Sequence, residues 1–210
     1  LQMFKIVVLS AVVILVFGAE PEMQTQCMCK DFDPCYEKAA DTVLKCTDKC
    51  KHLLVDLGAD YTEARKCVSV HQPKIQKAAE CARKSLGEMC TNKQDQMVKK
   101  YYPENLQLAA VTELMAMAKK SGLLGKSIPM LDQSRKAAHC MIKCTATTDC
   151  SRKLKCAVEM PPDNVAVAKV KKCAISSGFT TPVAREICTC LEKSGIKQLE
   201  TICPSLEITE

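Results

Sequence analysis

The chain has 210 residues, which is enough for one ordinary domain or two small ones. Apolar residues make up 47% of it, a normal share for a folded protein, and 16 cysteines bring it near the level of a disulfide scaffold. The 30 basic and 24 acidic residues are spread along the chain, which excludes a charge-driven disordered tail and argues against a nucleic-acid partner.

Residues 1–19 predict a secretory signal peptide. Lys5 supplies a positive charge, an apolar stretch follows at 6–17, and Gly18 and Ala19 offer small residues for cleavage. This stretch is too short to cross about 30 Å of hydrocarbon as a helix. We therefore expect the rest of the chain to be secreted as an extracellular protein with no transmembrane anchor.

Secretion determines how the cysteines are interpreted. An even number in an oxidising compartment predicts eight disulfides. Zinc is the rival interpretation, but Cys-x2-Cys pairs are absent and His52, His71 and His139 do not stand at ligand spacing. The spacing leaves the pairing open. The predicted disulfide cysteines are Cys27, Cys29, Cys35, Cys46, Cys50, Cys67, Cys81, Cys90, Cys140, Cys144, Cys150, Cys156, Cys173, Cys188, Cys190 and Cys203.

The cysteines fall into two blocks with related spacing. Each block contains a Cys-x16-Cys pair that ends at Cys67 or Cys173, followed by Pro-x7-Cys-x2-Lys-Ser around Cys81 or Cys190. Shared spacing of this kind predicts a diverged tandem repeat. The expected organisation is a signal peptide at 1–19, a first cysteine-rich helical repeat at 20–92, a central helix and connector at 93–135, and a second repeat at 136–210.

The segments between the cysteines carry helical periodicity, and strand alternation is hard to find. The first helix is expected to begin at Asp33-Pro34, a capping residue before proline, and to run to Gly58. Further helices are expected from Pro73, from Pro103 to the Lys119-Lys120-Ser121-Gly122 ending, around 137–144, at 164–173 and at 182–193. The predicted fold class is all-α and disulfide-rich, with two diverged helical repeats joined by a long central helix that bridges the two halves or packs on both.

The most promising segment for catalytic chemistry is 29–36. Its Asp33, Cys35 and Tyr36 are similar to the active-site helix of secreted phospholipase A2, and the resemblance implies a calcium ligand at Asp33. Phe32 stands where that family has its histidine, so no general base activates the attacking water. We interpret Asp33 as a helix cap and predict that the protein is not an enzyme and has no cofactor or metal site.

The second block has the spacing Cys144-x5-Cys150-x5-Cys156-x16-Cys173, and Phe179, Cys190-Leu-Glu-Lys and Cys203 follow. This spacing resembles a cysteine-rich secreted domain of unknown function that is expanded in nematodes. The resemblance covers 144–203 and implies a secreted, helical, disulfide-rich protein. It implies no activity and no functional residue.

Pairs of lysines stand at 99–100, 119–120 and 171–172. They are either a basic face for anionic membranes or heparin-like polymers, or an ordinary solvated surface. Acidic residues are interspersed throughout, so we favour the solvated surface.

Two functions from different classes remain. A protein-interacting secreted factor, toxin-like or host-directed, predicts an exposed, lysine-rimmed methionine patch for an extracellular protein partner. A carrier of an apolar small molecule such as a lipid predicts an enclosed cavity. We favour protein interaction, because small helical disulfide domains usually have filled cores. The methionines near the central helix are Met115, Met117, Met130 and Met141, and the candidate pocket residues are Leu53, Leu57, Ile75, Leu86, Leu106, Leu114 and Met117.

Overall fold

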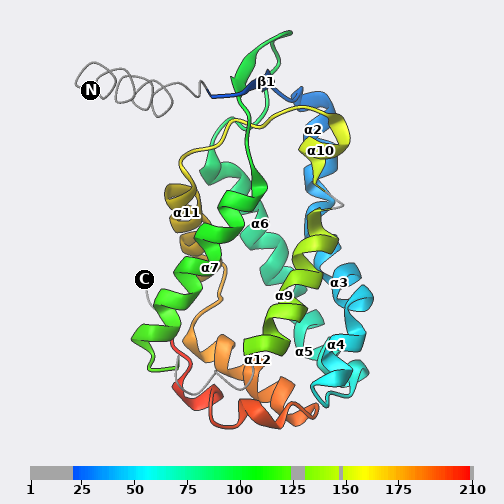
Figure 1. Cartoon of the computed structure of the whole chain (residues 1–210), viewed down its shortest axis with the longest axis vertical. Helices are drawn as coiled ribbons and strands as arrows, with labels where there is room; N and C mark the ends of the chain where they lie inside the picture. Colours follow the sequence, from blue (N-terminus) through cyan, green and yellow to red (C-terminus); the bar gives the residue numbers. More distant parts are fainter. Residues whose placement is uncertain (1–20, 124–130, 147–148, 209–210) are drawn as a thin grey trace, which may run out of the picture.

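The computed structural model describes residues 21–123, 131–146 and 149–208 and consists mostly of helices (Figure 1). The predicted all-α, disulfide-rich fold class is confirmed. The predicted signal peptide lies outside the described residues. Within the described part of the chain, every helix is too short or too polar to cross a bilayer.

The helices form two sides of an elongated molecule. In Figure 1, α2, α3, α9 and α10 lie on one side, α7 and α11 on the other with α6 between the two sides, and α4, α5 and α12 at the end far from the strands. The elements before residue 100 are β1 (Met23–Thr25), α2 (Cys29–Glu37), α3 (Ala39–Lys49), α4 (Lys51–Asp56), α5 (Tyr61–Ser69), α6 (Gln72–Leu86) and β2 (Met97–Lys99), which pairs antiparallel with β1. The later elements are α7 (Pro103–Lys120), α9 (Leu131–Ala146), α10 (Cys150–Leu154), α11 (Asp163–Ser176), α12 (Thr181–Lys193), and the 3-10 turns η2 (Lys197–Leu199) and η3 (Cys203–Ser205).

The start of the first helix was predicted wrongly. Helix α2 begins at Cys29, so the Asp33-Pro34 dipeptide lies inside it and does not cap it. The backbone fixes the earlier start, because the Cys29 N–H donates to the Thr91 carbonyl at 2.9 Å. The Asp33 carboxylate instead accepts a hydrogen bond from the Arg83 guanidinium of α6 at 2.7 Å.

Proline and glycine signals locate most other helix ends. Helix α6 carries Pro73 in its first turn and ends at Gly87, and α7 runs from Pro103 to Lys120 as expected. Helix α5, which the structure contains, was not predicted from the sequence. Its cap is Asp60, whose carboxylate accepts a hydrogen bond from the Glu63 N–H at 3.1 Å, so the Asp-x-x-Glu spacing was an available signal.

Eight disulfides connect the helices and leave no described cysteine free. Six of them join residues 20–92 to residues 136–210. The two blocks therefore form one covalently joined unit, and their origin as a repeat stays a prediction. The bonds are Cys27–Cys156, Cys29–Cys90, Cys35–Cys150, Cys46–Cys144, Cys50–Cys140, Cys67–Cys190, Cys81–Cys173 and Cys188–Cys203.

Two of these bonds join the predicted repeats so that each bond links a cysteine of one repeat to a cysteine at a different repeat position in the other. The repeat pattern makes Cys67 equivalent to Cys173 and Cys81 equivalent to Cys190. In the fold, Cys67 bonds Cys190 and Cys81 bonds Cys173, so each cysteine bonds the non-equivalent one in the other block. Helix α5 accordingly packs on α12, and α6 packs on α11.

The apolar core consists of two separate clusters. One lies near the strands, and the other lies where α4 and α5 meet the segment after α12. Cysteines form much of the first cluster, so disulfides take over part of the role of a large hydrophobic core. The buried members of the first are Cys27, Phe32, Met89, Cys90, Cys150 and Val158, and those of the second are Leu57, Ala59, Ala64 and Ile196.

Two loops from the opposite halves approach closely beside the second cluster. The Asp60 N–H donates to the Ser194 carbonyl at 2.6 Å. A Cβ placed on Gly195 would lie 2.1 Å from the carbonyl oxygen of Gly58. Only glycine fits such an approach without a backbone shift.

We expect Gly195→Ala to lower the melting temperature more than Gly87→Ala. Both glycines have positive φ, +123° and +96°, so both substitutions add backbone strain of about 1–3 kcal/mol. A Cβ at Gly87 meets nothing within 4 Å, whereas one at Gly195 collides with a carbonyl. Thermal unfolding of the oxidised proteins, followed by circular dichroism, measures the difference. Equal losses would contradict the close approach of the two loops.

Candidate functional site

Helix α7 exposes an apolar surface. None of its residues is buried, although alanine, leucine, valine and methionine dominate its sequence. Leu108 is 68% exposed and Leu114 is 63% exposed. Val111 and Met115 are also exposed, and with Leu108 they follow the spacing of three and four residues that places side chains on one helix face. Because the apolar face of a helix normally packs against another element, these side chains form an apolar surface that the described chain leaves uncovered.

Helix α7 lies outside the disulfide framework. No cysteine occurs between Cys90 and Cys140, so no covalent bond ties α7 to its neighbours. Its main packing partner is α11, where Lys171 Nζ lies 2.7 Å from Glu113 Oε1. Tyr102, which precedes the first turn, donates a hydrogen bond from its hydroxyl to Glu22 of the first block at 2.8 Å, and packing of α7 on both halves stays a prediction. An ion pair between Glu104 and Arg152 adds a contact near its first turn.

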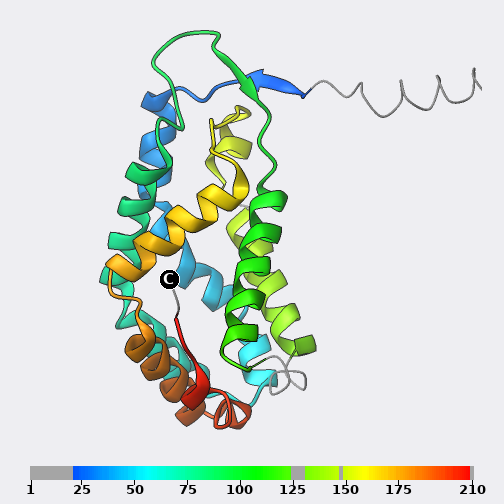
Figure 2. The same ribbon diagram turned by 90° about the vertical axis from the view of Figure 1, so that its left-hand side faces the viewer.

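A groove lies between α7 and α11, which diverge along their length (Figure 2). Its volume is about 840 Å³, and it is open to solvent rather than enclosed. The α7 wall is formed by residues spaced as one helix face, from Asn105 to Glu113, and the α11 wall runs from Asp163 to Ile175. The apolar lining consists of Leu108, Ala109, Val167, Ala168 and Ile175.

The groove continues toward the strands. A second hollow of about 490 Å³ shares Asn105 and Asp163 with it and follows the backbone of β2. The exposed side chains of Met23 and Met97 line this hollow. We expected exposed methionines near the central helix. Met23 and Met97 are exposed instead at the strand end of the groove, outside that helix. Of the expected four, Met115 is exposed, Met117 and Met141 are half-buried, and Met130 lies outside the described residues.

The seven residues predicted to line an enclosed pocket do not come together. Leu57 belongs to the second core cluster, Leu86 packs against the first, and Leu114 is exposed. None of the seven lines the α7–α11 groove or the two other main hollows of the described residues. Helical spacing indicated which side chains face inward but not which neighbour they face. The remaining four, all half-buried on α4, α6 or α7, are Leu53, Ile75, Leu106 and Met117.

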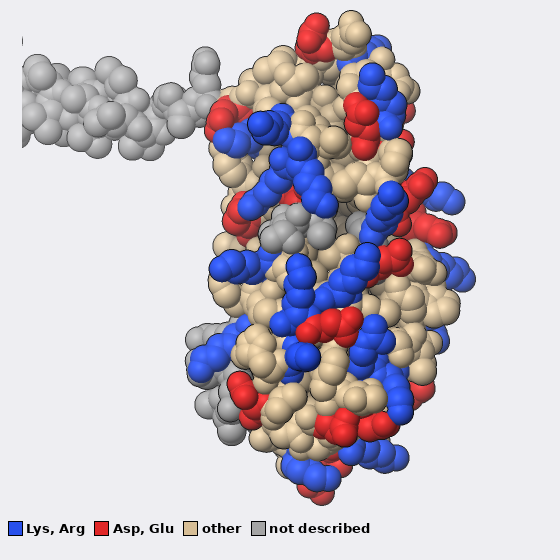
Figure 3. Space-filling view, turned by 90° about the vertical axis from the view of Figure 1, so that its right-hand side faces the viewer, with Lys and Arg blue, Asp and Glu red and all other residues tan. Residues whose placement is uncertain are grey.

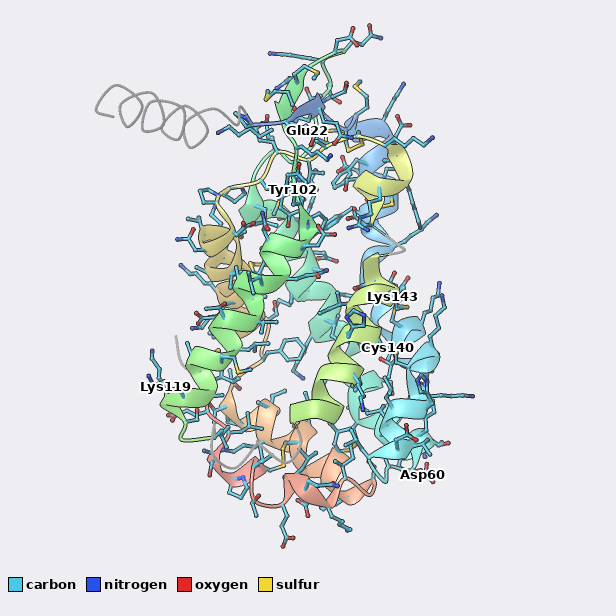
Figure 4. All side chains as sticks on the ribbon, in the orientation of Figure 1. Glu22, Asp60, Tyr102, Lys119, Cys140 and Lys143 are labelled. Carbon is cyan, nitrogen blue, oxygen red and sulfur yellow. A yellow bond between two sulfur atoms is a disulfide. The ribbon has the colours of Figure 1, made fainter. Side chains whose placement is uncertain are left out.

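The lysine pairs do not form one basic face. Lys100 Nζ lies 2.7 Å from Glu22 Oε1, and Lys171 is paired with Glu113. Lys119 projects at the far end of α7 from Glu22 and Tyr102 (Figure 4). On the side of the molecule that carries α3 and α9, acidic groups lie among the many basic ones (Figure 3). This arrangement favours the solvated-surface interpretation.

The described residues offer little for catalysis or metal binding. Cys29, Asp33 and Cys90 meet within 4.8 Å, but the two cysteines are bonded to each other and provide no thiolate. His71 is buried, with 4% of its surface exposed, and its Nε2 lies 4.0 Å from Glu186 Oε1. Among the described residues, no hydroxyl or thiol hydrogen-bonds to this imidazole. The exposed surface of α7 and the adjoining α7–α11 groove are therefore the leading candidate sites.

Comparisons with protein-family models, curated proteins and solved structures found no match to this chain. The resemblance of the second block to the nematode domain stays a prediction.

A polar cluster connects α3 to α5 on the surface. The Tyr61 hydroxyl and the Arg65 Nε both donate to Asp48 Oδ1, the latter at 2.7 Å. Burial, followed by the hydrogen bond with Asp48, raises the pKa of Tyr61 to about 12. The hydrogen bond from Arg65, followed by that from Tyr61, lowers the pKa of Asp48.

We expect Tyr61 to ionise near pH 12 rather than near pH 10. Its folded pKa lies above the unfolded value, so its stabilising contribution is complete below about pH 10 and is lost as the pH rises to about 12. The ultraviolet difference titration of the native protein against Tyr61→Phe isolates this phenol. Asp48→Ala should lower the midpoint, and a native midpoint near 10 would rule out the hydrogen bond.

Proposed function

We propose that this chain is an extracellular binding protein that recognises a protein partner through one face of α7. Leu108, Val111 and Met115 define this α7 face. The observation that carries the proposal is the exposure of these three apolar side chains along one face of an 18-residue helix in which no residue is buried. Exposed apolar patches on soluble proteins usually mark interaction sites. We propose no catalytic activity, because no described hydroxyl or thiol lies in hydrogen-bond contact with the buried His71 imidazole, and the cysteines beside Asp33 are bonded to each other.

The disulfides support an extracellular site of action. Bonds of this number form and persist in oxidising compartments, where secreted proteins fold. They also hold α6 and α11 in a fixed relation through Cys81–Cys173, and α11 is the support against which α7 packs. A preformed surface loses less conformational entropy on binding, which favours recognition by such a face.

Charge near the α7 face indicates the chemistry of the partner. Lys119 and Lys120 stand in the last turn of α7, and neither has a carboxylate within ion-pair distance among the described residues. Cations at a helix C-terminus are favourable for the helix itself and leave positive charge beside the apolar residues. The complementary partner presents an apolar surface flanked by carboxylates. The α7 face lies on an open surface rather than around an enclosed void, which is why we place protein recognition before carriage of a small molecule.

A photo-reactive amino acid placed at position 111 should form a crosslink to one extracellular protein. The same amino acid placed at position 55 should not crosslink that protein. Val55 is a matched control, because it is also an exposed valine and lies on α4, away from the α7 face. The crosslinked protein is then purified and its affinity measured by surface plasmon resonance. Val111→Asp should weaken binding by at least about tenfold, and Val55→Asp should leave it unchanged.

Two outcomes would overturn the proposal. One is the absence of a protein that is captured selectively from position 111. The other is a partner whose affinity is equally sensitive to Val111→Asp and Val55→Asp, since this would place recognition elsewhere. Both positions are solvent-exposed, so neither substitution is expected to impair folding.

A further inference from the structure

We infer that the groove between α7 and α11 binds the alkyl chain of a free, single-chain carboxylate, with the carboxylate held by Lys172. This inference goes beyond the proposed function: the groove shares Leu108 with the α7 face, but Val111 and Met115 do not line it, and its ligand is a small molecule. The volume of about 840 Å³ lies in the range of roughly 300–1,000 Å³ that is usual for small-molecule sites.

The lining determines the apolar part of the ligand. Leu108, Val167 and Ile175 supply branched aliphatic side chains, and Ala109 and Ala168 keep the space between the helices open. No aromatic residue lines this groove, so it offers no stacking platform for a sugar or a nucleobase. An alkyl chain matches such a lining, because its burial depends on area and not on directed polar contacts.

The charges determine the polar part of the ligand. Glu113 and Lys171 neutralise each other across the two helices at 2.7 Å. Lys172 also lines the groove and has no carboxylate within ion-pair distance among the described residues. Asp163 stands nine residues away on α11, about 14 Å along the helix axis, and disfavours an anion at that end. The anionic head group of the ligand is therefore placed at Lys172, and its alkyl chain extends along the groove toward Asn105 and Asp163.

Isothermal titration with dodecanoate below its micelle concentration tests the inference. We expect one dodecanoate to bind per protein, and dodecyltrimethylammonium and butyrate to bind much more weakly, since one has the wrong charge and the other lacks the chain. Lys172→Glu should weaken dodecanoate binding by about fivefold. Lys197→Glu makes the same change of charge on η2, away from the groove, and should leave the affinity unchanged.

A blocking variant separates the groove from the α7 face. Ala168 is exposed and lines the groove, so Ala168→Trp fills it without disturbing the core and should abolish dodecanoate binding. Val111→Asp should retain it. No binding of dodecanoate, equal binding of the cationic analogue, or loss with Val111→Asp but not with Ala168→Trp would each overturn the inference. Val111 belongs to the α7 face alone and Ala168 to the groove alone, so failure here is distinguishable from failure of the proposed protein interaction.

Discussion

The disulfides that cross between the two halves of the chain are the constraint on which the other features of this molecule depend. They close loops of about a hundred residues, and closure of such long loops removes many conformations from the unfolded chain. The two core clusters are small, and much of the first consists of the cystines themselves. Covalent bonds therefore provide the order that a single large core provides in other helical proteins of this size.

The same framework explains the position of α7. Every cysteine lies before residue 91 or after residue 139, so the framework holds the elements on both sides of α7 but not α7 itself. This helix is kept in place by packing on α11 and by ion pairs at Glu104 and Glu113. An element with few buried contacts opens locally at a lower free energy than the core, a property that binding elements commonly share. The exposed α7 face and the groove beside it are both consequences of this arrangement.

The sequence was informative about helix ends and much less so about what the helices face. Proline in the first turn and glycine after the last turn located α6, because both residues act on the backbone directly. Asp33 has the same local signal, yet the Cys29 hydrogen bond to the second half of the first block starts α2 earlier. The candidate pocket failed to assemble for a related reason. Leu57 and Leu114 have inward spacing on their own helices, but one meets a core cluster and the other meets solvent.

The cysteine pairing could not be predicted from the sequence either, because it depends on which helices become neighbours in the fold. Mass spectrometry of peptides from the unreduced protein, digested at acidic pH to prevent exchange, tests the central claim most directly. Our account predicts no free thiol and a peptide with Cys67 linked to one with Cys190, together with Cys81 linked to Cys173. Cys67 linked to Cys81, with Cys173 linked to Cys190, would leave α5 without a covalent bond to α12 and α6 without one to α11, and would contradict the interlocked framework.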